Sequence, residues 1–222
     1  MKILIVEDDK TIAEQLCDYL REAGFVVHVE NDGEVGHYEG EAGQYDAILL
    51  DLGLPTMDGV SILEKWRKAK ITTPVLIITA RTSKMEVIRG LEQGADDYIT
   101  KPFDMEEVAA RIRSTIRRAR GQGATQAVYK NVTYDMRSGR VFVNGVPAKL
   151  TRTEFLIVQY LFINQGKLVP LNELIDHTYE DFDNDSSIIA RHVANIRKKI
   201  GHEIIMTETN RGYYVPKEPG GE

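Results

Sequence analysis

Ala47-Ile48-Leu49-Leu50-Asp51 is the stretch that decides the fold of this 222-residue chain. A short apolar run of this kind is typical of a buried strand, and the residue that ends it is an aspartate. Three other apolar runs end in polar residues in the same way: Ile3–Val6 before Glu7-Asp8-Asp9, Val75–Ile78 before Thr79-Ala80, and Tyr98–Thr100 before Lys101-Pro102. Acid, hydroxyl and amine groups at the ends of successive strands predict a site that holds a divalent cation and a phosphoryl group.

The first 120 residues alternate between strand and helix patterns. Near-continuous apolar strands predict a parallel sheet covered on both faces, so the predicted fold class is a doubly wound, five-stranded α/β domain. Ligands of such sheets bind at the carboxyl ends of the strands. The expected strands are 2–6, 25–29, 46–50, 75–79 and 97–100, and the expected helices cover about 12–23, 84–93 and 104–120, with another beginning near 62 and a short, weak one in the glycine-containing stretch 33–43.

The remaining residues form a different pattern, which predicts a second, α+β domain. Gly121-Gln122-Gly123 opens a predicted flexible linker, 121–127. Asn144-Gly145 after an alternating run is a strong signal for a β-hairpin. The predicted domains are therefore 1–120 and 128–217, and the second is expected to contain strands at 128–134, 140–143, 203–207 and 213–215 and helices at about 153–164, 171–178 and 186–200.

Composition favours a soluble globular protein of the cytoplasm. Hydrophobic residues make up 42% and charged residues 28% of the chain, and no apolar run approaches the roughly 18 residues of a membrane span. A single cysteine, Cys17, fits a reducing compartment and a buried packing role. Residues 1–120 hold 16 basic against 22 acidic residues, and residues 121–222 hold 12 of each. Binding to nucleic acid would therefore depend on a local patch of the second domain.

Asp51 is the predicted phosphoryl acceptor, because a carboxylate at the end of a strand is rigidly aimed for nucleophilic attack. Glu7 and Asp8 are hard oxygen ligands for Mg²⁺, with Mn²⁺ as the alternative ion, and the Gly53 carbonyl is expected to complete the set. Thr79 and Lys101 can donate hydrogen bonds to phosphoryl oxygens. Asp9 is expected to cap the following helix. Taken singly, each of these residues would more often be only a helix cap or part of a turn, but together, in this order and on this topology, they favour the site.

The predicted helix 186–200 is the second candidate site. Its apolar residues Ile189, Val193, Ile196 and Ile200 are spaced by four, three and four residues, so one face should pack inward. The other faces carry Arg191, His192, Asn195, Lys198 and Lys199, with Arg197 at the apolar edge. Basic and amide side chains on an exposed helix suit reading of the DNA major groove. The alternative is a solvated helix whose basic residues only interact with its dipole.

Residues 1–120 resemble the receiver domain of bacterial two-component response regulators. The matching motifs are Ile5-Val6-Glu7-Asp8-Asp9, Leu50–Gly59, Thr79-Ala80-Arg81 and Gly94–Phe103. The resemblance implies the flavodoxin-like receiver fold, Mg²⁺-dependent transfer of phosphate from a sensor histidine kinase to Asp51, and reorientation of Thr79 and Tyr98 afterwards. Without the resemblance, Tyr98 could equally be a packing residue at the sheet edge.

Residues 128–216 resemble the winged helix-turn-helix domain of the OmpR/PhoB class, on the motifs Leu150–Ile157, His192–Gly201 and Thr209–Val215. The resemblance implies that helix 186–200, with Ser187 among its contacts, reads the major groove of double-stranded DNA. It also implies that Arg211 lies in a DNA-contacting wing and that the loop at about 179–185 faces RNA polymerase. The usual Arg-Gly-x-Gly-Tyr signature reads Arg211-Gly212-Tyr213-Tyr214 here.

The resemblance also implies a phosphorylation-dependent homodimer on tandem half-sites. Its intersubunit ion pairs correspond to Asp97 with Arg111 and Asp96 with Arg118, whereas Glu107 faces Val87 where a basic residue is common. The predicted function is regulation of transcription by a protein that is not an enzyme. A phosphatase-like hydrolase is the alternative within the enzymes, but such enzymes place an acid where this chain has Gly53. A protein-binding adaptor is the third alternative, and salt-dependent binding to duplex DNA would distinguish it.

Overall fold

The computed structural model describes residues 1–80, 92–121, 123–179, 187–209 and 211–217. The chain separates into two compact units, one from Lys2 to Gly123 and the other from Ala124 to the C-terminal end. We call these the N-terminal and the C-terminal unit. The first strand of the C-terminal unit begins at Gln126, so the predicted linker 121–127 overlaps this strand by two residues.

The N-terminal unit is built on a five-stranded parallel sheet in the order β2-β1-β3-β4-β5. Strands β1, β3 and β4 are almost wholly buried, as their continuous apolar runs predict. The order reverses between β1 and β3, so the carboxyl ends of β1, β3 and β4 meet beside this switch point. The strands are β1 (Lys2–Val6), β2 (Val26–Glu30), β3 (Ala47–Asp51), β4 (Val75–Thr79) and β5 (Asp97–Thr100).

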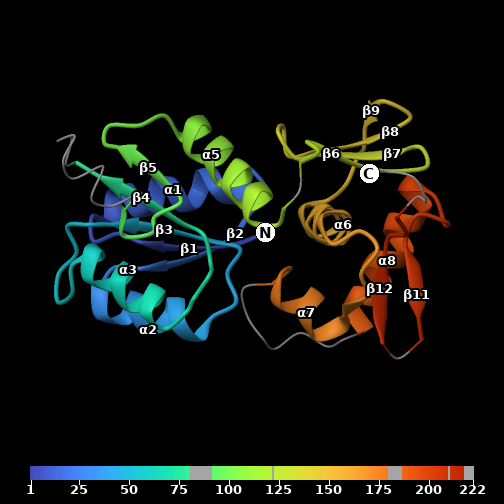
Figure 1. Cartoon of the computed structure of the whole chain (residues 1–222). Coiled ribbons are helices and arrows are strands. Elements are labelled where there is room, and N and C mark those ends of the chain that lie inside the picture. The colour runs from blue at the N-terminus through green and yellow to red at the C-terminus, as the bar shows by residue number, and fades with distance from the viewer. Residues whose placement is uncertain (81–91, 122, 180–186, 210, 218–222) are drawn as a thin grey trace. The chain divides into compact units, whose positions relative to one another are not determined.

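Helices cover both faces of this sheet: α1 and α5 lie on one face and α2 and α3 on the other (Figure 1). Each of these helices begins with an aspartate whose side chain accepts hydrogen bonds from backbone amides of the first turn, which stabilises the helix start. The helices are α1 (Lys10–Glu22), α2 (Gly33–Ala42), α3 (Gly59–Lys68) and α5 (Met105–Ala119). The helix predicted at 84–93 falls almost wholly outside the described residues.

Helix α2 is ten residues long and lies within the glycine-containing stretch for which a short helix is predicted. Two of these glycines lie where the helix closely approaches its neighbours. A Cβ atom at Gly36 would lie 2.4 Å from Val6 Cγ1, and one at Gly40 would lie 2.3 Å from Trp66 Cζ2. Close packing against β1 and α3 therefore offsets the low helix propensity of glycine.

In its described residues, the C-terminal unit has two small antiparallel sheets and three helices. A four-stranded sheet has the order β6-β7-β8-β9, and a three-stranded sheet has the order β10-β12-β11. Asn144 and Gly145 connect β8 to β9 with φ angles of 51° and 77°, as the predicted hairpin requires. The strands are β6 (Gln126–Tyr129), β7 (Val132–Asp135), β8 (Arg140–Val143), β9 (Val146–Pro147), β10 (Val169–Pro170), β11 (Met206–Glu208) and β12 (Gly212–Tyr214).

The three helices of the C-terminal unit are α6 (Arg152–Ile163), α7 (Leu171–Asp176) and α8 (Ser187–Ile200). Thr151 and Glu154 form a complete capping box at the start of α6. In α8, Ile189, Val193, Ile196 and Ile200 are buried, so the predicted inward face is confirmed. Among the described residues, no helix has the length and apolar character needed to cross a lipid bilayer.

Candidate functional site

Asp51 ends β3 and is only 7% exposed. Its two carboxylate oxygens have different partners. Oδ2 lies 2.6 Å from the Lys101 ammonium nitrogen, and Oδ1 accepts a hydrogen bond of 3.1 Å from the backbone amide of Gly53. A Cβ atom at Gly53 would lie 3.9 Å from Oδ1, so glycine leaves this side of the carboxylate open. Both oxygens of the buried aspartate therefore have a hydrogen-bond donor, and no side chain at residue 53 covers Oδ1.

Glu7 and Asp8 follow β1, the neighbour of β3 in the sheet. One carboxylate oxygen from each of Glu7, Asp8 and Asp51 lies within 4.8 Å of the other two, so the structure brings the three predicted acids together. Glu7 is buried and Asp8 is exposed. Asp9 instead accepts hydrogen bonds from the backbone amides of Thr11 and Ile12, which confirms its predicted role as a helix cap.

Lys101, just after β5, reaches across the sheet edge and holds two of these acids together. Its ammonium donates hydrogen bonds of 2.8 Å to Glu7 Oε1 and 2.6 Å to Asp51 Oδ2. Burial alone would lower the pKa of Lys101, but the hydrogen bonds to Asp51 and Glu7 outweigh it and the pKa is raised. The ammonium therefore stays charged at the pH of a cell and offsets the repulsion between the two carboxylates.

Burial strongly perturbs Glu7. It raises the pKa of this carboxyl to about 7; the nearby Asp51 adds to the shift, and the bond from Lys101 opposes it. The second oxygen, Oε2, lies 2.7 Å from the Lys101 nitrogen but has no partner in hydrogen-bond geometry. A buried carboxylate oxygen without a hydrogen bond is costly in a protein interior unless it finds a cation. The Lys101 ammonium is the cation beside this oxygen in the structure, so a metal ion bound there would replace that contact.

Thr79 and Tyr98 lie on the two strands beyond Asp51. Thr79 ends β4 and is 2% exposed, and its backbone carbonyl accepts a hydrogen bond of 2.8 Å from the Lys101 amide. Tyr98 in β5 is half-buried and packs against the core cluster that contains Ile77 and Trp66. The structure thus places Thr79 at the end of the strand next to β3 and gives Tyr98 a packing contact. The expected reorientation of both residues stays a prediction.

One residue near Asp51 was not singled out from the sequence. A Cβ atom at Gly59, the first residue of α3, would lie 2.1 Å from the backbone oxygen of Asp51. The Gly59 amide also donates a hydrogen bond to the Leu52 carbonyl. Only glycine allows α3 to start this close to the end of β3. The dipeptide Asp58-Gly59, a helix cap followed by glycine, is the sequence signal that could have indicated the need for glycine at this position.

The residues expected at a dimer interface have partners within this protein. Arg111 bonds both Asp97 oxygens at 3.2 Å and Glu107 Oε1 at 2.8 Å. Asp96 accepts hydrogen bonds from the Arg67 guanidinium and the Val75 amide rather than from Arg118. Arg118 donates to the hydroxyls of Ser114 and Thr115 on its own helix. These are contacts within one chain, so the expected pairing of Asp96 with Arg118 between two subunits stays a prediction.

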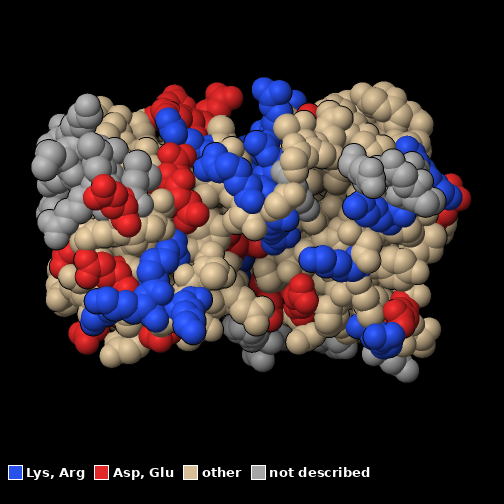
Figure 2. Space-filling view, in the orientation of Figure 1, with Lys and Arg blue, Asp and Glu red and all other residues tan. Residues whose placement is uncertain are grey.

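The outward side chains of α8 divide into two groups. Ser187, Arg191 and Lys198 are exposed, whereas His192 and Asn195 are half-buried. The pKa of His192 is lowered by burial and by the charge of Arg191, against an opposing effect of Glu154, so the neutral ring is favoured. In the face shown in Figure 2, basic residues of the C-terminal unit are scattered among uncharged ones. This face therefore shows no single basic patch on the described part of the C-terminal unit.

Three of the basic residues on α8 and in the hairpin of β11 and β12 have partners within the C-terminal unit. Arg197 donates from Nε and Nη2 to the Ile205 carbonyl and from Nη2 to the Thr207 hydroxyl at 2.6 Å. Its guanidinium thus fixes α8 to the segment leading into β11. Its expected contact with DNA stays a prediction. Lys199 bonds Glu154 of the capping box at 2.6 Å, and Arg211 pairs with Glu208, a neighbour in the same hairpin.

Comparison with known proteins agrees with this arrangement. A family model described as the response regulator receiver domain matches residues 3–113, and one described as the C-terminal part of transcriptional regulatory proteins matches residues 145–215. The transcriptional regulatory protein CiaR of Streptococcus pneumoniae is 39% identical over 90% of this chain and 89% of its own length. The response regulator protein PmrA of Pseudomonas aeruginosa is 35% identical over 96% of this chain and 97% of its own.

Among solved structures, a Francisella response regulator receiver domain matches 53% of this chain and 97% of its own with a TM-score of 0.52 and 38% identity. Fold, acidic site and helix arrangement together define a phosphate-handling receiver followed by a transcriptional regulatory domain. The chain belongs to the OmpR/PhoB family of two-component response regulators. It is a transcriptional regulator that combines a receiver with a DNA-binding domain.

Proposed function

We propose that Asp51 accepts a phosphoryl group from a sensor histidine kinase and that this modification controls DNA binding. The observation that supports this most strongly is the arrangement around Asp51. Its carboxylate is fixed by Lys101 at 2.6 Å, is flanked by Glu7 and Asp8, and is left uncovered by Gly53. No other acid of the unit combines these features within its described residues.

In the proposed step, a carboxylate oxygen of Asp51 attacks the phosphorus of a phosphohistidine. The oxygen–phosphorus bond forms as the nitrogen–phosphorus bond breaks, and the kinase imidazole leaves. Lys101 already donates a hydrogen bond to the Asp51 carboxylate, so its ammonium is in place to neutralise charge on a phosphoryl oxygen. Thr79, at the adjacent strand end, is the proposed hydroxyl donor to the same group.

The residues present suit a divalent cation. Glu7, Asp8 and Asp51 offer only oxygen ligands, and Glu7 Oε2 has no hydrogen bond. Such a set favours Mg²⁺, or Mn²⁺ as the alternative, with the Gly53 carbonyl as a further proposed ligand. When bound, the ion would neutralise charge that develops on the phosphoryl oxygens. A bound cation would take the place of the Lys101 ammonium beside Glu7, and Lys101 would then be free to contact the phosphoryl group.

Phosphorylation adds roughly −1.5 to −2 charges beside Thr79, enough to reorient a hydroxyl and a half-buried ring. We propose Thr79 and Tyr98 as the residues that carry this change to the sheet edge. A homodimer through Asp96, Asp97, Glu107, Arg111 and Arg118 is the proposed consequence. For the homodimer to form, these side chains must give up their partners within one chain and pair with residues of a second chain.

The proposed DNA contacts are those side chains of α8 that the structure leaves directed outward. Ser187, Arg191, His192, Asn195 and Lys198 would face the major groove of duplex DNA at tandem half-sites. The side chain of Arg211 is 66% exposed. Once its ion pair with Glu208 breaks, it would contact the DNA backbone beside the wing. Arg197 is proposed to position α8 rather than to read bases. The proposed setting is the bacterial cytoplasm, with RNA polymerase as a further partner.

The test is intact-protein mass after incubation with acetyl phosphate and Mg²⁺. We expect one phosphoryl adduct on the wild type, none on Asp51→Asn, and an unchanged adduct on Asp18→Asn, which removes an exposed acid elsewhere in the unit. If the wild type gives no adduct with acetyl phosphate, binding of beryllofluoride to the protein is measured instead. Absence of both responses, or an adduct on Asp51→Asn, would refute the assignment. Rapid release of phosphate from an external ester would instead favour the hydrolase alternative.

A further inference from the structure

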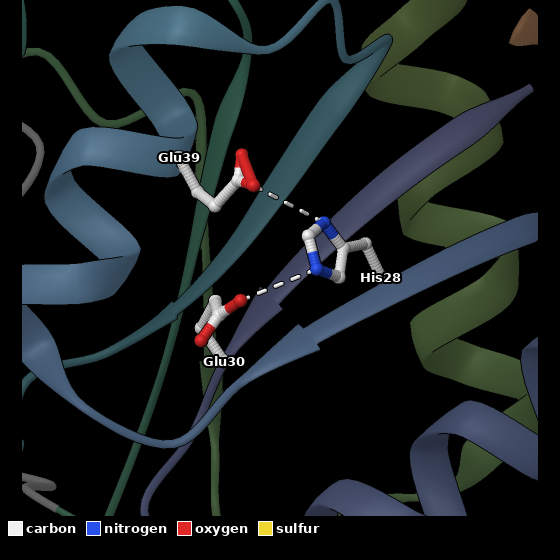
Figure 3. A group of neighbouring side chains, drawn as sticks. All are labelled: His28, Glu30 and Glu39. Carbon is white, nitrogen blue, oxygen red and sulfur yellow. Dashed lines mark ion pairs between the residues drawn. The ribbon is translucent and has the colours of Figure 1, made fainter. Parts of the chain in front are cut away.

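A second group of potential ligands lies on the flank of the N-terminal unit. His28 and Glu30 are two residues apart on β2, so their side chains leave the strand on the same side, and Glu39 approaches from α2 (Figure 3). His28 Nε2 lies 3.2 Å from Glu30 Oε1, and Nδ1 lies 3.9 Å from Glu39 Oε1. One donor atom from each of the three lies within 4.8 Å of the other two.

The chemistry of this group differs from that around Asp51. It combines one imidazole with two carboxylates, whereas the acidic site has oxygen donors alone. Imidazole with carboxylate suits Zn²⁺ and neighbouring transition metals rather than Mg²⁺. All three side chains are half-buried, with exposed fractions of 39%, 22% and 35%, so an ion can enter while being partly shielded.

Tyr45 supplies the kind of outer contact that metal-binding histidines usually have. Its hydroxyl lies 2.6 Å from His28 Nδ1. A ring nitrogen held by such a partner fixes the orientation of the imidazole and leaves Nε2, the atom nearest Glu30, to bind an ion. Burial raises the pKa of Tyr45, and the charges of Glu39 and Glu30 raise it further, which shows that the surroundings are electronegative.

We propose that His28, Glu30 and Glu39 form a binding site for a divalent transition metal, with Zn²⁺ as the reference ion. Donors around one such ion lie about 2.0–2.2 Å from it. The separation of Nε2 and Glu30 Oε1 already fits two ligands of one ion. Glu39 Oε1 lies 3.9 Å from Nδ1, the nitrogen that Tyr45 holds, so the Glu39 side chain must rotate toward Nε2 to join the same ion. This side chain is 35% exposed, which leaves it room to rotate. The ion would join α2 to β2.

The ordinary explanation of the same geometry is a pair of ion contacts to a protonated His28. The two explanations differ in what they require of each residue. Ion pairing requires only opposite charges, whereas metal binding requires all three donors at once and saturates at one ion. Zn²⁺ titration of the full chain by calorimetry therefore separates them. Saturating Mg²⁺ is included so that the acids around Asp51 do not take up Zn²⁺.

Two ligand variants and two matched controls complete the experiment. His28→Gln and Glu39→Gln each remove one proposed donor, and Glu39 lies partly exposed on its helix, so its variant should keep the fold. His202→Gln and Glu34→Gln remove the same groups from exposed positions outside the site. We expect one equivalent bound by the wild type and both controls, and affinity about tenfold or more lower in each ligand variant.

Thermal unfolding supplies a second readout, because an ion that binds only the folded chain raises its melting temperature. Zn²⁺ should raise the melting temperature of the wild type and controls but not of the two ligand variants. The proposal is overturned if the wild type shows no saturable Zn²⁺ binding beside saturating Mg²⁺. It is also overturned if Glu39→Gln binds Zn²⁺ as tightly as Glu34→Gln does.

Discussion

At the scale of single residues, Glu7 is a buried carboxyl group close to another negatively charged side chain. It is 1% exposed and close to Asp51, and only the ammonium of Lys101 offsets both effects. A carboxyl group so placed is a good ligand because a cation removes the cost of burying its charge. Without a cation, the same group favours its protonated form near neutral pH. Metal affinity and stability are thus linked through one side chain.

This linkage gives a prediction for the metal-free protein in the presence of a chelator. The pKa of Glu7 is about 7 in the folded chain and 4.5 for the unperturbed group. The folded state therefore binds more protons than the unfolded state between these values, and its stability falls as pH rises from about 4.5 to about 7. The contribution of Glu7 reaches at most about 3 kcal/mol, at 1.36 kcal/mol per pKa unit.

Urea unfolding of wild type and Glu7→Gln at a series of pH values measures this contribution. Glutamine does not titrate, so the difference in unfolding free energy between the two proteins should change by up to about 3 kcal/mol across the window. Glu14→Gln, an exposed position on α1, is the control and should follow the wild type. A difference that stays constant with pH would show that Glu7 does not carry the shifted proton.

At the scale of secondary-structure elements, α2 illustrates a conflict between local propensity and packing. Glycine at 36 and 40 weakens an isolated helix by about 1 kcal/mol each relative to alanine. Both glycines nevertheless let the helix axis come close to β1 and α3, where Val6 and Trp66 fill the space. Trp66 also donates a hydrogen bond of 3.0 Å to the His37 carbonyl of the same helix. The close approach is therefore held by more than one contact.

We predict that Gly40→Ala destabilises the protein even though alanine is the better helix former. The new methyl group would meet the Trp66 ring at 2.3 Å, and overpacking of a buried ring typically costs about 1–3 kcal/mol. Gly123→Ala is the matched control, because nothing lies within 4 Å of a Cβ atom there. Thermal and urea unfolding measure both. A Gly40→Ala protein as stable as the wild type would show that α2 can shift without penalty.

In the C-terminal unit, we predict that neighbouring basic residues of α8 have separable roles. Arg197 bonds the Ile205 carbonyl and the Thr207 hydroxyl, whereas Lys198 is exposed. Arg197→Ala should lower the unfolding free energy by about 1–3 kcal/mol, because it leaves the carbonyl without its charged donor. Lys198→Ala should leave stability within about 0.5 kcal/mol and reduce the salt dependence of DNA binding by about one unit of slope. Equal losses of stability would contradict this division.

These elements also show how far the sequence could predict the molecule. The apolar runs before Asp51, Thr79 and Lys101 predicted three strands whose ends meet, because burial on both faces leaves a clear signal. The packing that holds α2 could not be predicted, because glycine propensity is local and the close approach of Gly40 to Trp66 is not. The partners of Arg197 and Asp96 could not be predicted either, since each depends on how a distant segment packs.

At the scale of the whole molecule, the proposed dimer must compete with contacts inside each chain. Arg111 already bonds Asp97 and Glu107, and these partners are partly exposed. An exposed ion pair contributes only about 0–1 kcal/mol, so exchanging it for the same pair across an interface is nearly neutral. The bias toward dimerisation must then come from elsewhere. The change at Thr79 and Tyr98 that phosphorylation is proposed to cause is the natural source, because it alters the sheet edge beside Asp97.

We therefore predict that association depends on activation rather than on charge alone. Sedimentation velocity should show a shift toward dimer when beryllofluoride and Mg²⁺ are added to the wild type, and a weaker shift for Arg111→Ala. Lys68→Ala removes an equal charge from the exposed end of α3 and should behave as the wild type does. Affinity for DNA with two tandem half-sites should rise in parallel, because a dimer binds both at once. Identical association with and without beryllofluoride would mean that the acidic site does not control assembly.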